Sequence, residues 1–250
     1  ITGSSNYKDI QNSDVVIVTA GFPRRPGMSR NDLVEKNSKI IQEVGKAIKK
    51  FCPKAFVICI TNPLDAMVSV LQNSASIKTN MCVGMAGVLD TSRFKYFLSQ
   101  ELNVPISEVD SFVLGGHGDT MVPITRLATI GGVPITDLIS ADRISEIEER
   151  TRFAGGEIVK LFGNGSAFYA PAQSAIEMAE SYIKDKKRVI PCASLCEGEF
   201  GIDGYFIGVP TVIGADGVER ILEFELQTHE KEALNNTLVA VQKTASETGL

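Results

Sequence analysis

The stretch from Asp14 to Ala20 reads DVVIVTA, an apolar run of β-branched residues with no alternating polar positions. A strand of this kind is typical of a parallel sheet that is covered on both faces. A loop punctuated by Pro and Gly follows at residues 21–29, and apolar residues then recur at helical spacing over about residues 31–51. This order predicts the first strand, loop and helix of an α/β fold.

The same pattern continues along the chain. A second buried strand is expected at residues 55–60, a helix over about 64–72 and a short strand at 81–84. Beyond Gly84 the pattern changes: helices are expected near 91–102, 144–162, 169–184 and 230–245, with strands at 111–114, 188–195 and 204–213. The sequence therefore predicts a Rossmann-like parallel sheet in residues 1–84 and an α+β substrate domain in residues 85–250.

One signature of a dinucleotide-binding sheet is absent from this chain. Such a sheet opens with a strand, a Gly-x-Gly-x-x-Gly turn and a helix, but no such glycine motif occurs between Ile1 and Cys52. We therefore expect a strand-helix-strand-helix unit, on the order of 70–80 residues, to belong before Ile1.

Composition narrows the class of protein. The net charge of −5 argues against a nucleic-acid partner, which usually requires a basic excess. No apolar run reaches the roughly 18 residues that a membrane span needs, and the five cysteines are scattered with no Cys-x-x-Cys pair. We expect a cytoplasmic protein with buried free thiols, no metal site and no membrane partner.

Two segments carry candidate functional residues. His117 lies in the segment GGHGD after a predicted strand, where flanking glycines let a ligand approach closely. A structural histidine in a tight turn is the alternative. The loop after the first strand holds Arg24, Arg25 and Arg30, which could bind a carboxylate or phosphate, or could simply be solvated. The second histidine, His229, is expected to be a solvated residue in the first turn of the last helix.

Two further segments are ambiguous by themselves. Asp90 opens the predicted helix at 91–102, so capping alone would explain it, and Arg93 lies three residues further on the same helix face. Asn62 ends a predicted parallel strand, where either a turn former or a polar ligand group would fit.

The order of these motifs is more specific than any one of them. The loop VTAGFPRRPGMSR (18–30), TNP (61–63), MAGVLDTSRF (85–94) and GGHGD (115–119) together resemble the lactate/malate dehydrogenase family of 2-hydroxyacid dehydrogenases. The resemblance covers the whole chain, including FIGVPTVIG at residues 206–214, and is greatest for the lactate-dehydrogenase-like branch of malate dehydrogenases.

The resemblance implies a role for each matching residue. His117 would be the proton donor and acceptor, with Asp90 as its carboxylate partner. Arg93 would bind the substrate's C1 carboxylate, Arg30 would polarise its carbonyl group, and Asn62 would lie near substrate and nicotinamide ribose.

Arg24 lies six residues before Arg30, where the family selects its substrate. Arginine there is similar to enzymes for malate and oxaloacetate, whereas lactate enzymes typically have an uncharged residue. The expected partner is therefore a small dicarboxylate.

The resemblance also implies NAD as cofactor and a homotetramer or homodimer. The choice of NAD over NADP rests on it alone, because the acidic residue that contacts the adenosine ribose has no counterpart in this chain. Residues that match the family's cofactor contacts are Thr19, Ala20, Gly21, Asn37, Ile60, Thr61 and Asn62.

Three functions stay open at this point. The first is an NAD-dependent malate dehydrogenase. The second is a lactate or broader 2-hydroxyacid dehydrogenase on the same scaffold, which Arg24 disfavours. The third is a non-catalytic binding or assembly protein that has lost its cofactor loop.

Overall fold

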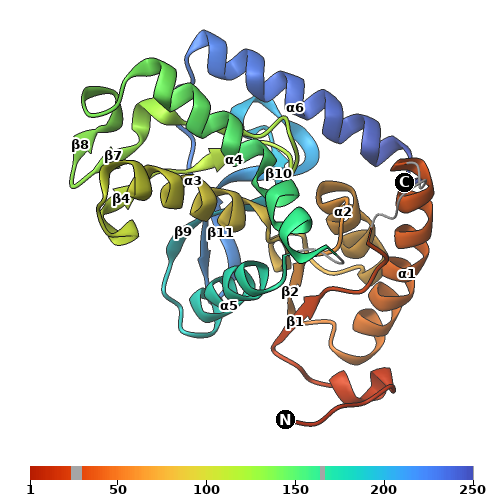
Figure 1. Ribbon diagram of the computed structural model, residues 1–250. Coiled ribbons are helices and arrows are strands. Elements are labelled where there is room, and N and C mark those ends of the chain that lie inside the picture. The colour runs from red at the N-terminus through yellow and green to blue at the C-terminus, as the bar shows by residue number, and fades with distance from the viewer. Residues whose placement is uncertain (24–29, 164–166, 250) are drawn as a thin grey trace.

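The structure is a computed structural model that describes residues 1–23, 30–163 and 167–249 (Figure 1). Within these residues the central sheet has six strands in the order β1-β2-β3-β9-β10-β11. The first three run parallel, and the other three add to the sheet in antiparallel pairs. The predicted α/β class is confirmed. The strands are β1 (Val15–Val18), β2 (Phe56–Cys59), β3 (Cys82–Gly84), β9 (Arg188–Glu197), β10 (Asp203–Gly214) and β11 (Gly217–Ile221).

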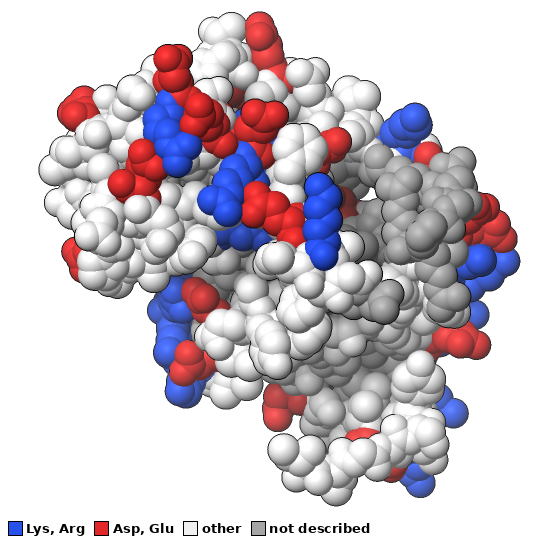
Figure 2. Space-filling model, viewed as in Figure 1, with Lys and Arg blue, Asp and Glu red and all other residues white. Residues whose placement is uncertain are grey.

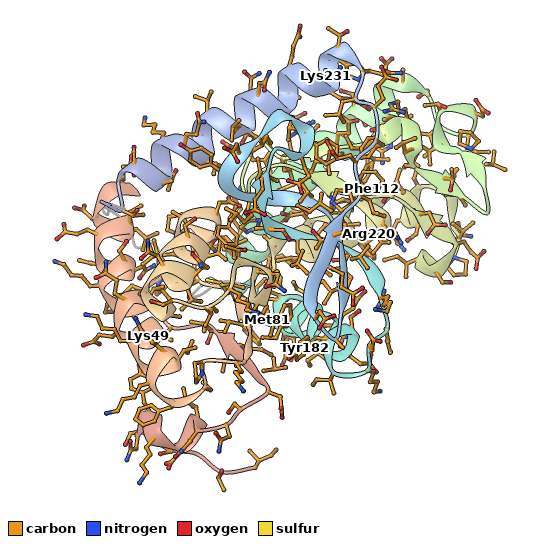
Figure 3. The ribbon with its side chains drawn as sticks, turned by 180° about the vertical axis from the view of Figure 1, so that it is seen from behind. Lys49, Met81, Phe112, Tyr182, Arg220 and Lys231 are labelled. Carbon is orange, nitrogen blue, oxygen red and sulfur yellow. The ribbon has the colours of Figure 1, made fainter. Side chains whose placement is uncertain are left out.

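Helices cover both faces of the parallel strands. Helices α1 (Arg30–Phe51) and α2 (Leu64–Ala75) share one apolar core with Val57 and Cys59 of β2. Phe56 and Ile58 point to the opposite face, into a core with α5 (Tyr169–Ile183) and the start of α3 (Ala86–Leu102). Met81 and Tyr182 border this second core and lie close together in Figure 3. Because every β2 side chain is buried, the strand lacks the polar alternation of a half-exposed one.

The C-terminal half adds two helices and several short strands. Helix α4 (Ala141–Phe162) packs on α3, while α6 (Thr228–Ser246) crosses the molecule and ends beside the beginning of α1 (Figures 1 and 3). The short strands are β4 (Val109–Asp110), β5 (Val113–Leu114), β6 (Val122–Pro123), β7 (Thr129–Ile130) and β8 (Val133–Pro134). Short 3-10 helices are η1 (Tyr7–Ile10), η2 (Thr79–Met81), η3 (Ile106–Glu108), η4 (Thr125–Leu127), η5 (Ile135–Asp137) and η6 (Glu199–Gly201).

The central sheet continues across the expected division of the chain at residue 84. Gly84 of β3 pairs antiparallel with Ala193 of β9, so residues far beyond the division complete the same sheet. Helix α3 begins directly after β3 and lies against β9. A Cβ atom at Gly87 would be 2.6 Å from the carbonyl carbon and oxygen of Pro191, so only glycine permits this approach.

One expectation about α3 is wrong. The helix begins at Ala86 rather than near residue 91, so Asp90 lies inside the helix and does not cap it. The residue at the N-cap, Met85, makes no side-chain capping bond. The start of α3 is instead held by its packing against β9, which a search for capping residues does not detect.

The expectations about the cysteines and about His229 hold. All five cysteines are buried and free, and His229 is exposed near the start of α6. In the part of the chain that the structure describes, no helix combines the length and apolar character needed to cross a membrane.

Lysine and arginine side chains alternate with acidic ones on the face shown in Figure 2. Ion pairs account for much of this pattern where α3 meets α4. Arg143 binds Glu101 and Glu146, and Arg150 binds Glu157 while it lies over the ring of Phe97. These pairs are solvent-exposed, so each contributes little to stability alone.

Candidate active site

His117 lies in the loop that follows β5, and its side chain points to helix α3. Its Nδ1 is 2.9 Å from Oδ2 of Asp90, a residue 27 positions earlier in the sequence. The Asp90 side chain is only 4% exposed and that of His117 is 20% exposed. With Asp90 as acceptor for the Nδ1 proton, Nε2 is the ring nitrogen that gains or loses a proton as the imidazole titrates.

Arg93 is the third member of this group. Its Nη1 lies 3.3 Å from Oδ1 of Asp90, so the two carboxylate oxygens serve the arginine and the histidine separately. The Arg93 guanidinium also lies against α4 at Gly155, where an added Cβ would be 3.7 Å from Nη1. Among the described residues no acceptor other than Asp90 binds this guanidinium, so it retains donors for a substrate carboxylate.

The charges around His117 favour its protonated form. Burial opposes a charge on the ring, but the charge and hydrogen bond of Asp90, together with the charge of Asp65, outweigh burial and the nearby Arg93. The pKa of His117 is therefore raised above its usual value. An imidazole tuned in this way can take up and release a proton near neutral pH.

Three structural elements fix the backbone of the His117 loop. Gly115 exchanges two backbone hydrogen bonds with Gly208 of β10, at 2.9 and 3.0 Å. The N–H of Gly116 donates to Thr237 of α6, and the N–H of His117 donates to Asp65 of α2.

Neither Thr237 nor Asp65 was among the site residues predicted from the sequence. A signal existed for Asp65, which lies two residues after TNP in the sequence, whereas Thr237 lies in an ordinary amphipathic helix that gives no such signal.

The carboxyl ends of β1 and β2 provide the expected cofactor region. Thr19, Gly21 and Asn62 are exposed there, and Ala20 and Ile60 are half-buried. Pro63, the next residue after Asn62, lines a cavity of about 50 Å³ together with His117. The end of β2 therefore lies beside the His117 loop.

Two residues expected to contact the cofactor are buried and hydrogen-bonded within the protein. Asn37 is fully buried; its Oδ1 accepts from the N–H of Phe22, and its Nδ2 donates to the carbonyls of Phe22 and Asn62. Thr61 is also buried and donates from its hydroxyl to the carbonyl of Ala20 at 2.8 Å. These bonds join the two strand ends, so Asn37 and Thr61 shape the backbone rather than present side chains to a ligand.

The carboxyl ends of β1 and β2 fit the part of a dinucleotide site that this chain forms. A Cβ atom at Gly21 would lie 2.7 Å from Cγ2 of Thr61 and 3.1 Å from Oδ1 of Asn37, so only glycine keeps the β1 end this close to β2. The resulting bare backbone suits close approach of a cofactor.

Arg24 and Arg25 lie outside the described residues, as does the side chain of Arg30, although the residue itself begins α1. The structure therefore brings together His117, Asp90 and Arg93, with Asn62 at the edge of the same region.

Comparisons with known proteins agree with this geometry. Residues 1–84 match the family model for the NAD-binding domain of lactate/malate dehydrogenases, and residues 87–248 match that for the family's α/β C-terminal domain.

Solved structures of both kinds of enzyme are similar. Malate dehydrogenase from Cryptosporidium parvum is 46% identical with a TM-score of 0.96, covering 99% of this chain and 80% of that chain. Lactate dehydrogenase from the same organism, complexed with lactic acid and nicotinamide adenine dinucleotide, is 45% identical with a TM-score of 0.95 over the same shares. Malate dehydrogenase from Plasmodium falciparum is 36% identical with a TM-score of 0.94, covering 98% of this chain and 80% of that chain.

Family models thus match nearly the whole chain, and solved members share its fold at substantial sequence identity. This chain belongs to the lactate/malate dehydrogenase family.

Proposed function

We propose that this protein is an NAD-dependent malate dehydrogenase that interconverts (S)-malate and oxaloacetate, with His117 as the acid-base group. The observation that carries the proposal is the contact of Asp90 with both His117 and Arg93. A base, its orienting carboxylate and a cation for a substrate carboxylate stand within one turn of α3 and the adjacent loop.

Oxidation of malate removes a hydride from C2 and a proton from the C2 hydroxyl. Bound NAD would supply the hydride acceptor. Nε2 of His117 takes the proton, while Asp90 holds the Nδ1–H and stabilises the imidazolium that forms. In the reverse direction the same nitrogen returns the proton to the carbonyl oxygen of oxaloacetate.

Arg93 would hold the C1 carboxylate with the donors that Asp90 leaves free. Its position three residues after Asp90 on one helix fixes the carboxylate relative to the histidine. Arg30 would stabilise charge on the reacting oxygen, and Asn62 would add an amide contact. The role of Arg30 rests on the sequence motif.

The choice of malate over lactate rests on Arg24. Oxaloacetate carries a second carboxylate, which an arginine can bind through two hydrogen bonds. Pyruvate lacks that group and would leave the arginine without a carboxylate to bind, which would disfavour pyruvate roughly 10²–10⁴-fold.

A lactate or broader 2-hydroxyacid dehydrogenase is the second candidate. Lactate dehydrogenases from Cryptosporidium parvum and Eimeria maxima are as similar in sequence as several malate dehydrogenases are, at 45% and 44% identity. A non-catalytic binding protein is disfavoured, because a buried aspartate shared by a histidine and an arginine is costly to maintain without chemistry for it. The oligomeric state and the cytoplasmic location stay predictions.

The test compares oxaloacetate and pyruvate in the wild type and in Arg24→Gln and Arg25→Gln variants. We expect a preference for oxaloacetate that Arg24→Gln weakens by raising its KM, while turnover of pyruvate stays equal or improves. The adjacent Arg25→Gln is the matched control and should have much less effect. A ratio of the two kcat/KM values that neither variant changes by about tenfold, or ~1.4 kcal/mol, would contradict the malate assignment.

A further inference from the structure

Two consecutive backbone N–H groups of the His117 loop are each held by a side chain from a distant helix. The N–H of Gly116 donates to Oγ1 of Thr237 at 2.9 Å, and the N–H of His117 donates to Oδ2 of Asp65 at 2.9 Å. Thr237 lies 121 residues after Gly116, and Asp65 lies 52 residues before His117. The loop is therefore held between α6 and α2, on the backbone side of the imidazole.

The loop sequence is fitted to these two side chains. A Cβ atom at Gly116 would lie 3.2 Å from both Oδ2 of Asp65 and Oγ1 of Thr237, and 2.7 Å from Cγ2 of Val241. A Cβ atom at Gly115, where φ is +92°, would lie 2.7 Å from Cγ2 of Thr237. Glycine at both positions allows α2 and α6 to close on the backbone.

Asp65 is a buried carboxylate, so its burial requires a compensating interaction. Burial raises its pKa to about 6, against the hydrogen bond and charge of His117, which lower it. A buried carboxylate is costly unless it is hydrogen-bonded. A helix-capping or dipole role would not require burial, since both work at the surface. Its contact to His117 supplies the compensation.

The start of α6 is itself anchored. Gln227 and Glu230 form a capping box there, and the buried Glu230 also binds Arg126. Thr237 is fully buried and receives a second hydrogen bond, from the hydroxyl of Thr120 in the same loop region. The acceptor that holds Gly116 is therefore rigidly placed.

We propose that Asp65 and Thr237 are positioning residues for the proton-transfer step, holding adjacent N–H groups so that the His117 ring stays between Asp90 and the substrate. This inference rests on the proposed acid-base role of His117. Asp65 has a second effect that Thr237 lacks, since its charge also favours the imidazolium.

Among the residues that the structure describes, few charged groups face His117. Helix α3 contributes Asp90 and Arg93, and α2 contributes Asp65. From α6 the neighbours are Thr237 and Val241, and from β10 Gly208, none of which is charged. Replacing Asp65 with Asn would remove one of two carboxylates while keeping an oxygen acceptor, so the imidazolium should become less stable.

The first test is an NMR titration of the two histidines in the full chain. His117 and His229 give two imidazole Cε1–H signals, which a His229→Gln variant assigns. In Asp65→Asn the His117 signal should titrate at lower pH than in the wild type. The exposed His229 is the internal reference and should not move. Asp119→Asn, an exposed aspartate two residues after His117, is the matched charge control and should leave the His117 titration unchanged.

The second test is kinetic, with oxaloacetate and NADH. Asp65→Asn and Thr237→Val should each lower kcat about tenfold and leave KM within about twofold, because they disturb proton transfer rather than binding. Thr237→Ser, which retains the hydroxyl, should restore most of the activity. Ser174→Ala is the control, since Ser174 is buried in α5 and its hydroxyl donates to the carbonyl of Ala170 within that helix.

Each of the two tests has its own outcome that would contradict the proposal. An Asp65→Asn titration of His117 that coincides with the wild type would overturn the electrostatic role, whatever the substrate is. Activity of Thr237→Val equal to that of Ser174→Ala would overturn the positioning role. If the wild type does not turn over oxaloacetate, the proposed function is contradicted instead. The NMR titration of His117 then tests the inference.

Discussion

Oδ2 of Asp90 lies 2.9 Å from Nδ1 of His117, and its other oxygen lies 3.3 Å from Nη1 of Arg93. One buried carboxylate thus contacts both the proposed base and the arginine proposed to bind the substrate carboxylate. Because Asp90 is inside α3 rather than at its end, the helix backbone fixes its position. The sequence spacing of Asp90 and Arg93 sets their separation, and the loop after β5 brings His117 to them.

Replacing Asp90 with Asn should lower kcat on the order of 10²-fold. The amide keeps the shape and can still accept from Nδ1, but it no longer stabilises the imidazolium. KM should change much less. Asp110→Asn is the control, since Asp110 follows the same helix but its side chain is 86% exposed and lies 3.8 Å from Nζ of Lys95 in a long ion pair. Equal kcat in the two variants would show that Asp90 is not the orienting carboxylate.

The pH dependence should follow the raised pKa of His117. Oxidation of malate needs the neutral imidazole, so its kcat/KM should fall as the pH drops through a pKa above the usual 6.5. Reduction of oxaloacetate needs the imidazolium, so its kcat/KM should fall as the pH rises through the same pKa. Asp90→Asn should move both limbs to lower pH. If the wild-type pH profiles of kcat/KM change at a pKa below 6.5, they contradict a raised pKa of His117.

Gly87 offers a test of the packing between α3 and the sheet. Gly87→Ala would place a methyl group 2.6 Å from the backbone of Pro191, which cannot move without disturbing β9. We expect a loss of about 1–3 kcal/mol in the free energy of unfolding, measured by urea denaturation. Gly156→Ala in α4 is the control: it has open space around it and should gain about 0.5–1 kcal/mol. Similar stability of both variants would contradict the close contact.

Much of the fold follows from sequence patterns. The run at residues 55–60 predicted a strand buried on both faces, and β2 is buried throughout. The run at residues 14–20 predicted another such strand, and β1 is parallel to β2 but only partly buried, with Ile17 41% exposed, because β1 lies at the edge of the described sheet. The start of α3 was predicted too late, because Met85 and Ala86 carry no capping signal and the helix is held by contact with β9. The two-residue strands β6 and β7 are too short for any periodicity to reveal.

Only part of the candidate site could be predicted from the sequence. GGHGD and LDTSRF identified His117, Asp90 and Arg93, which the structure brings together. The two side chains that hold the His117 loop could not be predicted, because Asp65 lies 52 residues from His117 and Thr237 lies 121 residues from Gly116 in the sequence. The continuation of the sheet from β3 to β9 depends on a similar long-range pairing, Gly84 with Ala193.

Replacement of His117 tests the central claim most directly. The measurement is kcat for oxaloacetate reduction in a His117→Asn variant, together with NADH binding followed by cofactor fluorescence. His229→Asn is the matched control, since it changes the chain's only other histidine, which is exposed. If His117 is the acid-base group, kcat falls at least about 10²-fold while NADH still binds, and His229→Asn keeps wild-type turnover. Near-normal turnover of the His117→Asn variant would contradict the account.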